Sequence, residues 1–89
     1  MNKYEIIISV CDTHSISKTA ASLNYTQSAI SQAIKSFEKE LGFPLFKRSK
    51  HGMELMPNTE EIIASLKVIC REKKKIRQIA ANLTSLDSG

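Results

Sequence analysis

The chain has 89 residues, of which 42 % are hydrophobic and 25 % charged, values that are ordinary for a globular protein. Lys and Arg number 13 and Asp and Glu number 9, so the formal net charge is +4. This length suits one small domain and excludes a large enzyme. No apolar run approaches the roughly 18 residues that a membrane span needs, and the early Glu5 argues against a secretory signal. The composition favours a small binding module.

The cysteines and histidines do not form a metal or redox framework. Cys11 and Cys70 lie far apart in the sequence, and His14 and His51 are not adjacent to either of them. Free cysteines are often buried in proteins of a reducing cytosol, so we expect two thiols that face the core. The chain also lacks paired carboxylates, a Ser-His-Asp set and a Gly-rich phosphate loop. We therefore predict no catalytic residues, no metal, no cofactor and no enzymatic activity.

Glycine and proline divide the chain into three parts. Neither occurs in the first 41 residues, both occur between positions 42 and 57, and neither then recurs before Gly89. This distribution predicts helices, then a short irregular or β segment, then one long helix. The apolar spacing predicts a first helix over about residues 3–12. Its stripe consists of Tyr4, Ile7, Ile8 and Cys11.

Two further helices are predicted before Gly42. Ser15 or Ser17 can cap a short second helix, whose apolar side carries Ile16, Ala20, Ala21 and Leu23. Asn24 tolerates the left-handed conformation that ends a helix, and Thr26 is a suitable N-cap for a third helix over about residues 27–41. The apolar residues of this third helix recur every three or four positions and must face a core. They are Ile30, Ile34, Phe37 and Leu41.

The opposite face of the third helix carries no carboxylate. Its members are Gln27, Ser28, Ser31, Gln32, Lys35 and Lys39. Gln and Ser near the start of a helix, with Lys further along, suit the base edges and phosphates of a major groove. A merely solvated helix face is the alternative. The short helix, the tight turn and this polar helix together predict a helix-turn-helix.

A basic hairpin is predicted after the third helix. Residues 45–48 and 53–55 resemble short strands around a turn at 49–52. Lys50 and His51 lie at the tip with Arg48 at the neck, whereas Phe46 and Leu55 can face the core. Such a hairpin would be a wing that reaches the DNA backbone or a minor groove. The alternative is a solubilising loop.

The last helix is expected to begin near Pro57, with Asn58 and Glu61 as an alternative capping box. A helix of about 25 residues spans roughly 37 Å, too long to lie wholly on so small a core. Along this helix apolar residues recur every three or four positions over three heptads and form a seam that one lysine interrupts. The seam is Ile62, Leu66, Ile69, Lys73, Ile76, Ala80 and Leu83. Either a second copy covers it, or one half packs on the first helix and the rest is exposed or covered by another domain.

Four stretches resemble the N-terminal DNA-binding domain of LysR-type transcriptional regulators: SISKTAASL from position 15, TQSAIS from 26, FEKELG from 37 and LFKR from 45. The resemblance runs without a gap over about residues 3–60. It implies that residues 57–83 are a linker helix through which two protomers pair. Ser28 replaces a commoner Pro and Gln32 a frequent Arg, so the base preference is expected to be this protein's own. Such regulators carry an effector-binding domain about twice this size, which these 89 residues could not form, so we expect either an isolated domain or an unusually short protein.

We therefore expect a mostly α fold, in which residues 1–56 form a winged helix-turn-helix of three helices and a short β-hairpin, and residues 57–89 form the dimerisation helix. The expected function is sequence-specific binding of double-stranded DNA by a bacterial transcription regulator in the cytoplasm, associated with the nucleoid. The operator would be an interrupted palindrome, bound by a homodimer or higher oligomer. An effector would act only through the missing domain, and no membrane is involved.

The predicted DNA contacts are Lys18, Thr26, Gln27, Ser28, Ser31, Gln32, Lys35, Arg48, Lys50 and His51. The predicted dimer contacts are Ile62, Leu66, Ile69, Ile76 and Leu83. The alternative function is a winged-helix module that binds proteins and not DNA. The acid-free face of the third helix argues against this alternative.

Overall fold

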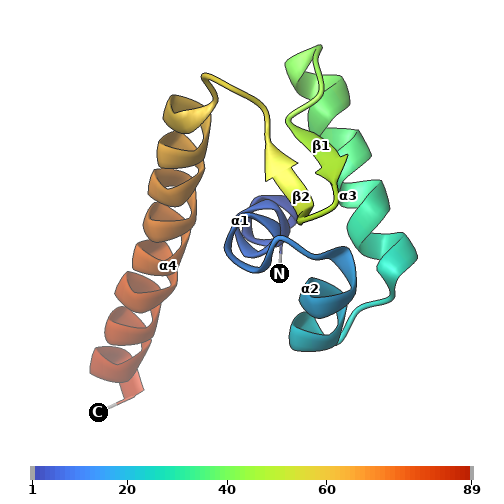
Figure 1. The fold of residues 1–89 in the computed structure, drawn as a ribbon. Helices are drawn as coiled ribbons and strands as arrows, with labels where there is room; N and C mark the ends of the chain where they lie inside the picture. The colour runs from blue at the N-terminus through green and yellow to red at the C-terminus, as the bar shows by residue number, and fades with distance from the viewer. Residues whose placement is uncertain (1, 89) are drawn as a thin grey trace.

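The computed structural model describes the backbone of residues 2–88 and the side chains of residues 2–85. Within these residues three helices, a two-stranded antiparallel hairpin and a fourth, longer helix follow one another (Figure 1). This arrangement confirms the predicted mostly α, winged helix-turn-helix fold with a long C-terminal helix. In chain order the elements are α1 (Lys3–Thr13), α2 (Ile16–Leu23), α3 (Gln27–Leu41), β1 (Phe46–Ser49), β2 (Gly52–Leu55) and α4 (Glu60–Ser88).

The first three helices begin at side-chain caps. The hydroxyl oxygen of Ser15 accepts a hydrogen bond from the backbone N–H of Lys18 at 3.1 Å, so Ser15 and not Ser17 caps α2. Thr26 caps α3 as predicted. Asn24 ends α2 in the left-handed conformation, with a φ of 61°, as the sequence predicted. These boundaries depend on short-range contacts, which explains why the sequence located them well.

The core lies around α1, which packs against α2, α3 and α4 (Figure 1). Its fully buried side chains include Ile7, Val10, Ile30 and Leu45. The expectation that Ala21 lies on the apolar side of α2 is wrong, because Ala21 is exposed. Successive residues of a helix are rotated by about 100°, and Ala20 takes the position that faces the core.

The hairpin pairs Phe46 with Leu55 and Arg48 with Met53. Phe46 and Met53 are buried and Leu55 packs against the core while part-exposed, so the predicted inward direction of Phe46 and Leu55 is confirmed. The backbone N–H of Met53 donates to the backbone oxygen of His14 at 2.8 Å. The wing is therefore attached to the turn between α1 and α2.

The last helix begins at Glu60, three residues later than the sequence indicated. Thr59, whose backbone oxygen accepts from Ile63, directly precedes the first helical residue, so Asn58 is not at the cap position and the alternative capping box with Glu61 does not form. Asn58 has a φ of 64° and belongs to the preceding turn. The hydroxyl of Thr59, which is 3 % exposed, donates to the backbone oxygen of Met56 at 2.8 Å. Residues 57–59 form a turn that leads the chain from β2 into α4, and of these three residues Thr59 is the buried one.

The seam of α4 divides into two halves. Leu66 is 3 % exposed and belongs to the core that α4 forms with α1, and Ile62 packs against the same core. Ile69, Ile76 and Leu83 are 44 %, 65 % and 59 % exposed. Leu66 was predicted to face a second protomer, and the structure instead places it within this chain's own core. The C-terminal half of α4 extends beyond the core along one side of the molecule (Figure 1).

The two cysteines are free and part-buried. Burial, with a contribution from nearby Asp12, raises the pKa of the Cys11 thiol to about 11, and Cys11 packs against the core as expected. Cys70 instead lines a groove between α1 and α4. Within residues 2–88 there is no helix long and apolar enough to cross a membrane. The side chains of residues 2–85 include no cluster suited to hold a metal.

Candidate nucleic-acid interface

The polar face of α3 is open to solvent near the start of the helix. Gln27, Ser28 and Gln32 are exposed, and Ser31 is part-buried. On the opposite face Ile30, Ile34 and Phe37 are buried in the core, which fixes the rotation of the helix. The hydroxyl oxygen of Thr26 accepts from the N–H of Ala29 at 3.1 Å, so the cap also holds the first turn in place. The exposed amides and hydroxyls are thus presented on a rigid helix.

A groove of about 410 Å³ brings together predicted contact residues from three elements and the wing turn. They are Lys18 from α2, Gln27 and Ser31 from α3, Arg48 from β1 and His51 from the wing turn. No Asp or Glu lines this groove. Two permanent cations in a concave polar site without carboxylates produce a positive potential that suits phosphate groups.

A smaller cleft of about 210 Å³ follows α3 toward its C-terminus and joins Lys35 to Arg48. The remaining predicted residues, Thr26, Ser28, Gln32 and Lys50, line neither cavity. They are exposed beside the start of α3 and at the tip of the wing.

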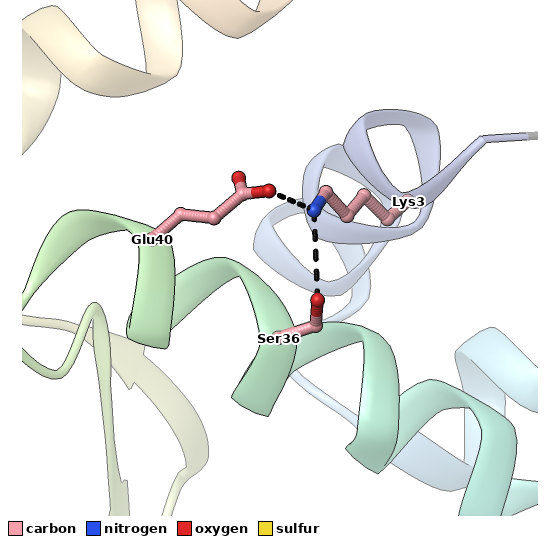
Figure 2. A network of polar contacts seen from close by, with 3 residues as sticks. All are labelled: Lys3, Ser36 and Glu40. Atoms are coloured by element: carbon pink, nitrogen blue, oxygen red, sulfur yellow. Dashed lines mark hydrogen bonds and ion pairs between the residues drawn. The ribbon is translucent and has the colours of Figure 1, made fainter.

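The carboxylates of α3 are bound elsewhere in the molecule. Oε2 of Glu38 accepts hydrogen bonds from the backbone N–H groups of Leu45 and Phe46 at 2.6 and 3.2 Å. The carboxylate of Glu40 forms an ion pair with Lys3 of α1, whose Nζ also lies 3.5 Å from the hydroxyl oxygen of Ser36 (Figure 2). Glu40 is thereby held away from the polar face, whereas Glu38 borders the smaller cleft beside Lys35 and Arg48 with its Oε2 bound by the two wing amides.

Sequence reasoning missed two contacts that hold the wing. The sequence assigned Glu38 no role, although its carboxylate binds the backbone N–H groups of Leu45 and Phe46 at the start of β1. His14 was regarded as isolated, but its Nδ1 lies 3.2 Å from the backbone oxygen of Met53. The contact of Glu38 with the wing could have been anticipated, because Glu38 follows the core residue Phe37 on α3. No local pattern predicts the His14 contact, because its partner lies 39 positions away.

Sequence reasoning also missed the hydroxyl lining of the groove. Ser15, Ser17 and Ser49 border it together with the predicted residues. The hydroxyl oxygens of Ser15 and Ser17 lie 3.1 Å apart at the start of α2. Their role as possible caps was the only signal in the sequence that placed them near the turn.

Known proteins resemble this chain over the residues that form the candidate interface. The family described as bacterial regulatory helix-turn-helix proteins, lysR family, matches residues 1–60. The HTH-type transcriptional regulator CzcR of Bacillus subtilis is 34 % identical over 91 residues, covering 100 % of this chain and 31 % of the relative. CzcR of Bacillus anthracis is 36 % identical over 75 residues, covering 84 % and 26 %. The chain thus spans about a quarter to a third of these relatives.

Two solved DNA complexes share the fold. The BenM DNA-binding domain in complex with catB site 1 DNA has a TM-score of 0.84 at 19 % identity, over 93 % of both chains. The CbnR DNA-binding domain in its DNA complex has a TM-score of 0.75 at 23 % identity, over 90 % of this chain and 94 % of that one.

Proposed function

Because the chain belongs to the lysR family of bacterial regulatory helix-turn-helix proteins, we propose that it binds double-stranded DNA as the DNA-binding part of a transcription regulator. The observation that carries the proposal is the carboxylate-free groove that unites Lys18, Gln27 and Arg48 from three elements. A module that binds only proteins would not require such a surface. The solved complexes of BenM and CbnR domains with DNA, which share this fold, support the same function.

In the proposed complex α3 enters the major groove with its first turn toward the base edges. The amide of Gln27 can donate and accept at once, which matches the N6 and N7 edge of adenine. Ser28 and Gln32 are exposed beside it and can reach neighbouring bases. Lys18 and Lys35 would contact phosphates on either side, since phosphate contacts set the register of a protein on DNA.

The wing would contact the sugar-phosphate backbone or the adjacent minor groove. Arg48, Lys50 and His51 are all exposed on it. Glu38 and His14 hold the two strands against α3 and the α1–α2 turn, so these side chains project from a fixed platform. This arrangement predicts contacts that position the protein and that do not depend on base sequence.

A second copy would pair along the open half of α4. Ile69, Ile76 and Leu83 form an exposed apolar stripe on this helix, and a lysine within such a seam can set register at a cost in stability. A two-fold dimer reads two half-sites, so the operator would be an interrupted palindrome. The relatives are longer than this chain, and a small-molecule effector would act through regions beyond these 89 residues. A bacterial cytoplasmic location, at the nucleoid, follows from this function.

The test compares Gln27→Ala with Arg48→Ala on DNA selected from genomic fragments. Gln27→Ala should cost about 1–3 kcal/mol on the selected site, relax selectivity at one position per half-site and leave binding to random duplex unchanged. Arg48→Ala should weaken the selected and the random duplex by similar factors. Mobility shifts on selected, singly substituted and random duplexes measure both. Equal weakening of all duplexes by Gln27→Ala would show that α3 does not read bases through this residue.

Salt dependence provides an independent check of the phosphate contacts. Lys18, Lys35, Arg48 and Lys50 supply about eight candidate contacts per dimer, so log K should fall against log salt with a slope of roughly −7. Arg48→Ala should make the slope shallower by about one unit per protomer. A parent slope shallower than about −2 would exclude the wing and α3 from the DNA.

A further inference from the structure

A second concave surface lies on the side of the molecule away from α3. It is a groove of about 580 Å³ between α1 and α4, bordered by Glu5 and Ile8 of α1 and by Leu23 at the end of α2. It shares no lining residue with the two cavities of the candidate DNA interface. α1 lies between this α4 side and α3 (Figure 1). The groove is therefore separate from the surface that would face DNA.

The groove combines an apolar floor with a basic rim. Ile8, Leu23 and the thiol of Cys70 form the apolar part. Burial and the nearby carboxylate of Glu5 raise the pKa of Cys70, so this thiol is uncharged at neutral pH. The rim is formed by Lys67, Arg71, Lys74 and Arg77 of α4, and Glu5 of α1 is the single carboxylate in the lining, so the groove keeps an excess of three positive charges. Among the side chains of residues 2–85 the one ion pair joins Lys3 and Glu40, so none of these four bases forms a salt bridge with another described side chain.

The four bases form a ladder along α4. Positions 67, 71, 74 and 77 recur every three or four residues and therefore lie on one side of the helix, over a length of about 15 Å. A compact anion would require cations that converge on one point, whereas a ladder of this period matches a second helix lying alongside. The exposed stripe of Ile69, Ile76 and Leu83 lies on a different side of α4. Pairing through that stripe would leave the groove open.

The geometry points to an acidic amphipathic helix of a partner protein as the occupant of the groove between α1 and α4. Its apolar side chains would pack on Ile8 and Leu23, and its carboxylates would face the bases of the rim. Duplex DNA fits less well, because a phosphate backbone gains nothing from the apolar floor. The α4 helix of a second copy also fits less well, since its own Lys67, Arg71 and Lys74 would face like charges.

A labelled synthetic peptide can test this on the 89-residue chain. The probe is a fluorescein-labelled helix of about 15 residues, with Leu along one face and Glu on both flanks, measured by anisotropy. Arg71→Glu and Lys74→Glu should each weaken its binding by roughly five- to tenfold, because each removes one attraction and adds one repulsion. Lys75→Glu is the matched control, since Lys75 is exposed on α4 and does not line the groove, and should change the affinity less than roughly twofold.

Four outcomes would overturn the proposal. Equal binding of a peptide with the same composition in scrambled order, or with every Leu replaced by Ser, would show that the apolar floor plays no part. Equal weakening of binding by Lys75→Glu and Lys74→Glu would show that the peptide responds to net charge and not to the groove. A loss of duplex binding in Lys74→Glu would make the groove part of the DNA surface. A change of sedimentation in the same variant would make it an interface between copies.

Discussion

Removing the carboxylate of Glu38 should strongly destabilise the fold, because this carboxylate binds two backbone N–H groups of the wing. Oε2 accepts from the N–H groups of Leu45 and Phe46 at 2.6 and 3.2 Å, and these two residues are 0 % and 7 % exposed. Hydrogen bonds to a charged acceptor contribute about 1.5–3 kcal/mol, and a buried N–H without a partner costs about 1–3 kcal/mol. Since both bonds share one oxygen, we expect Glu38→Ala to cost about 2–4 kcal/mol in total. For a domain of this size that lowers the melting temperature by roughly 10–25 °C.

Thermal and urea unfolding followed by circular dichroism measure this cost. Glu38→Gln keeps an acceptor oxygen and loses the charge, so it should cost about 1 kcal/mol and recover most of the loss. The control is Glu40→Ala, two positions further along the same helix, where the ion pair with Lys3 is solvent-exposed and contributes less than about 1 kcal/mol. Equal costs for Glu38→Ala and Glu40→Ala would refute the reasoning, because the two wing amides would then be satisfied by water.

Three further outcomes are expected. Ile76→Asp should abolish dimers in sedimentation without lowering the melting temperature of the monomer, because Ile76 is exposed. Leu66→Asp should instead unfold the chain, because it buries a charge in the core. Dimers that survive Ile76→Asp would show that the interface lies elsewhere. Gly52→Ala should cost about 2–4 kcal/mol in urea unfolding, because the new Cβ would lie 2.3 Å from a backbone oxygen, whereas Gly42→Ala, with open space around it, should cost about 1 kcal/mol. The pKa of the Cys11 thiol is raised from 9.0 to about 11, so folding favours the protonated thiol. The stability that this thiol contributes is complete below pH 9 and is lost as the pH rises from 9 through 11. Between pH 9 and 11 the melting temperature of the parent should therefore fall faster than that of Cys11→Ala.

The sequence by itself determined the local features of the fold. Asn24 and Thr26 end one helix and begin the next through contacts of three or four residues, so their side chains suffice to predict the turn. The bounds of α3 at residues 27 and 41 follow from the same short-range chemistry and from Gly42. The face that α3 exposes was equally predictable, because helical periodicity assigns each residue to a side once the apolar stripe is known.

Only the tertiary structure decided how these elements use their side chains. Leu66 and Ile76 belong to the same apolar repeat of α4 and are equivalent in the sequence. In the structure α1 covers Leu66 and leaves Ile76 exposed, because the core ends partway along the helix. Likewise Glu38 and Glu40 are both acids on α3, and their different roles depend on which distant groups approach them, the wing amides or Lys3. The contact of His14 with Met53 has the same origin. Periodicity describes one helix at a time, and burial depends on what the rest of the chain places against it.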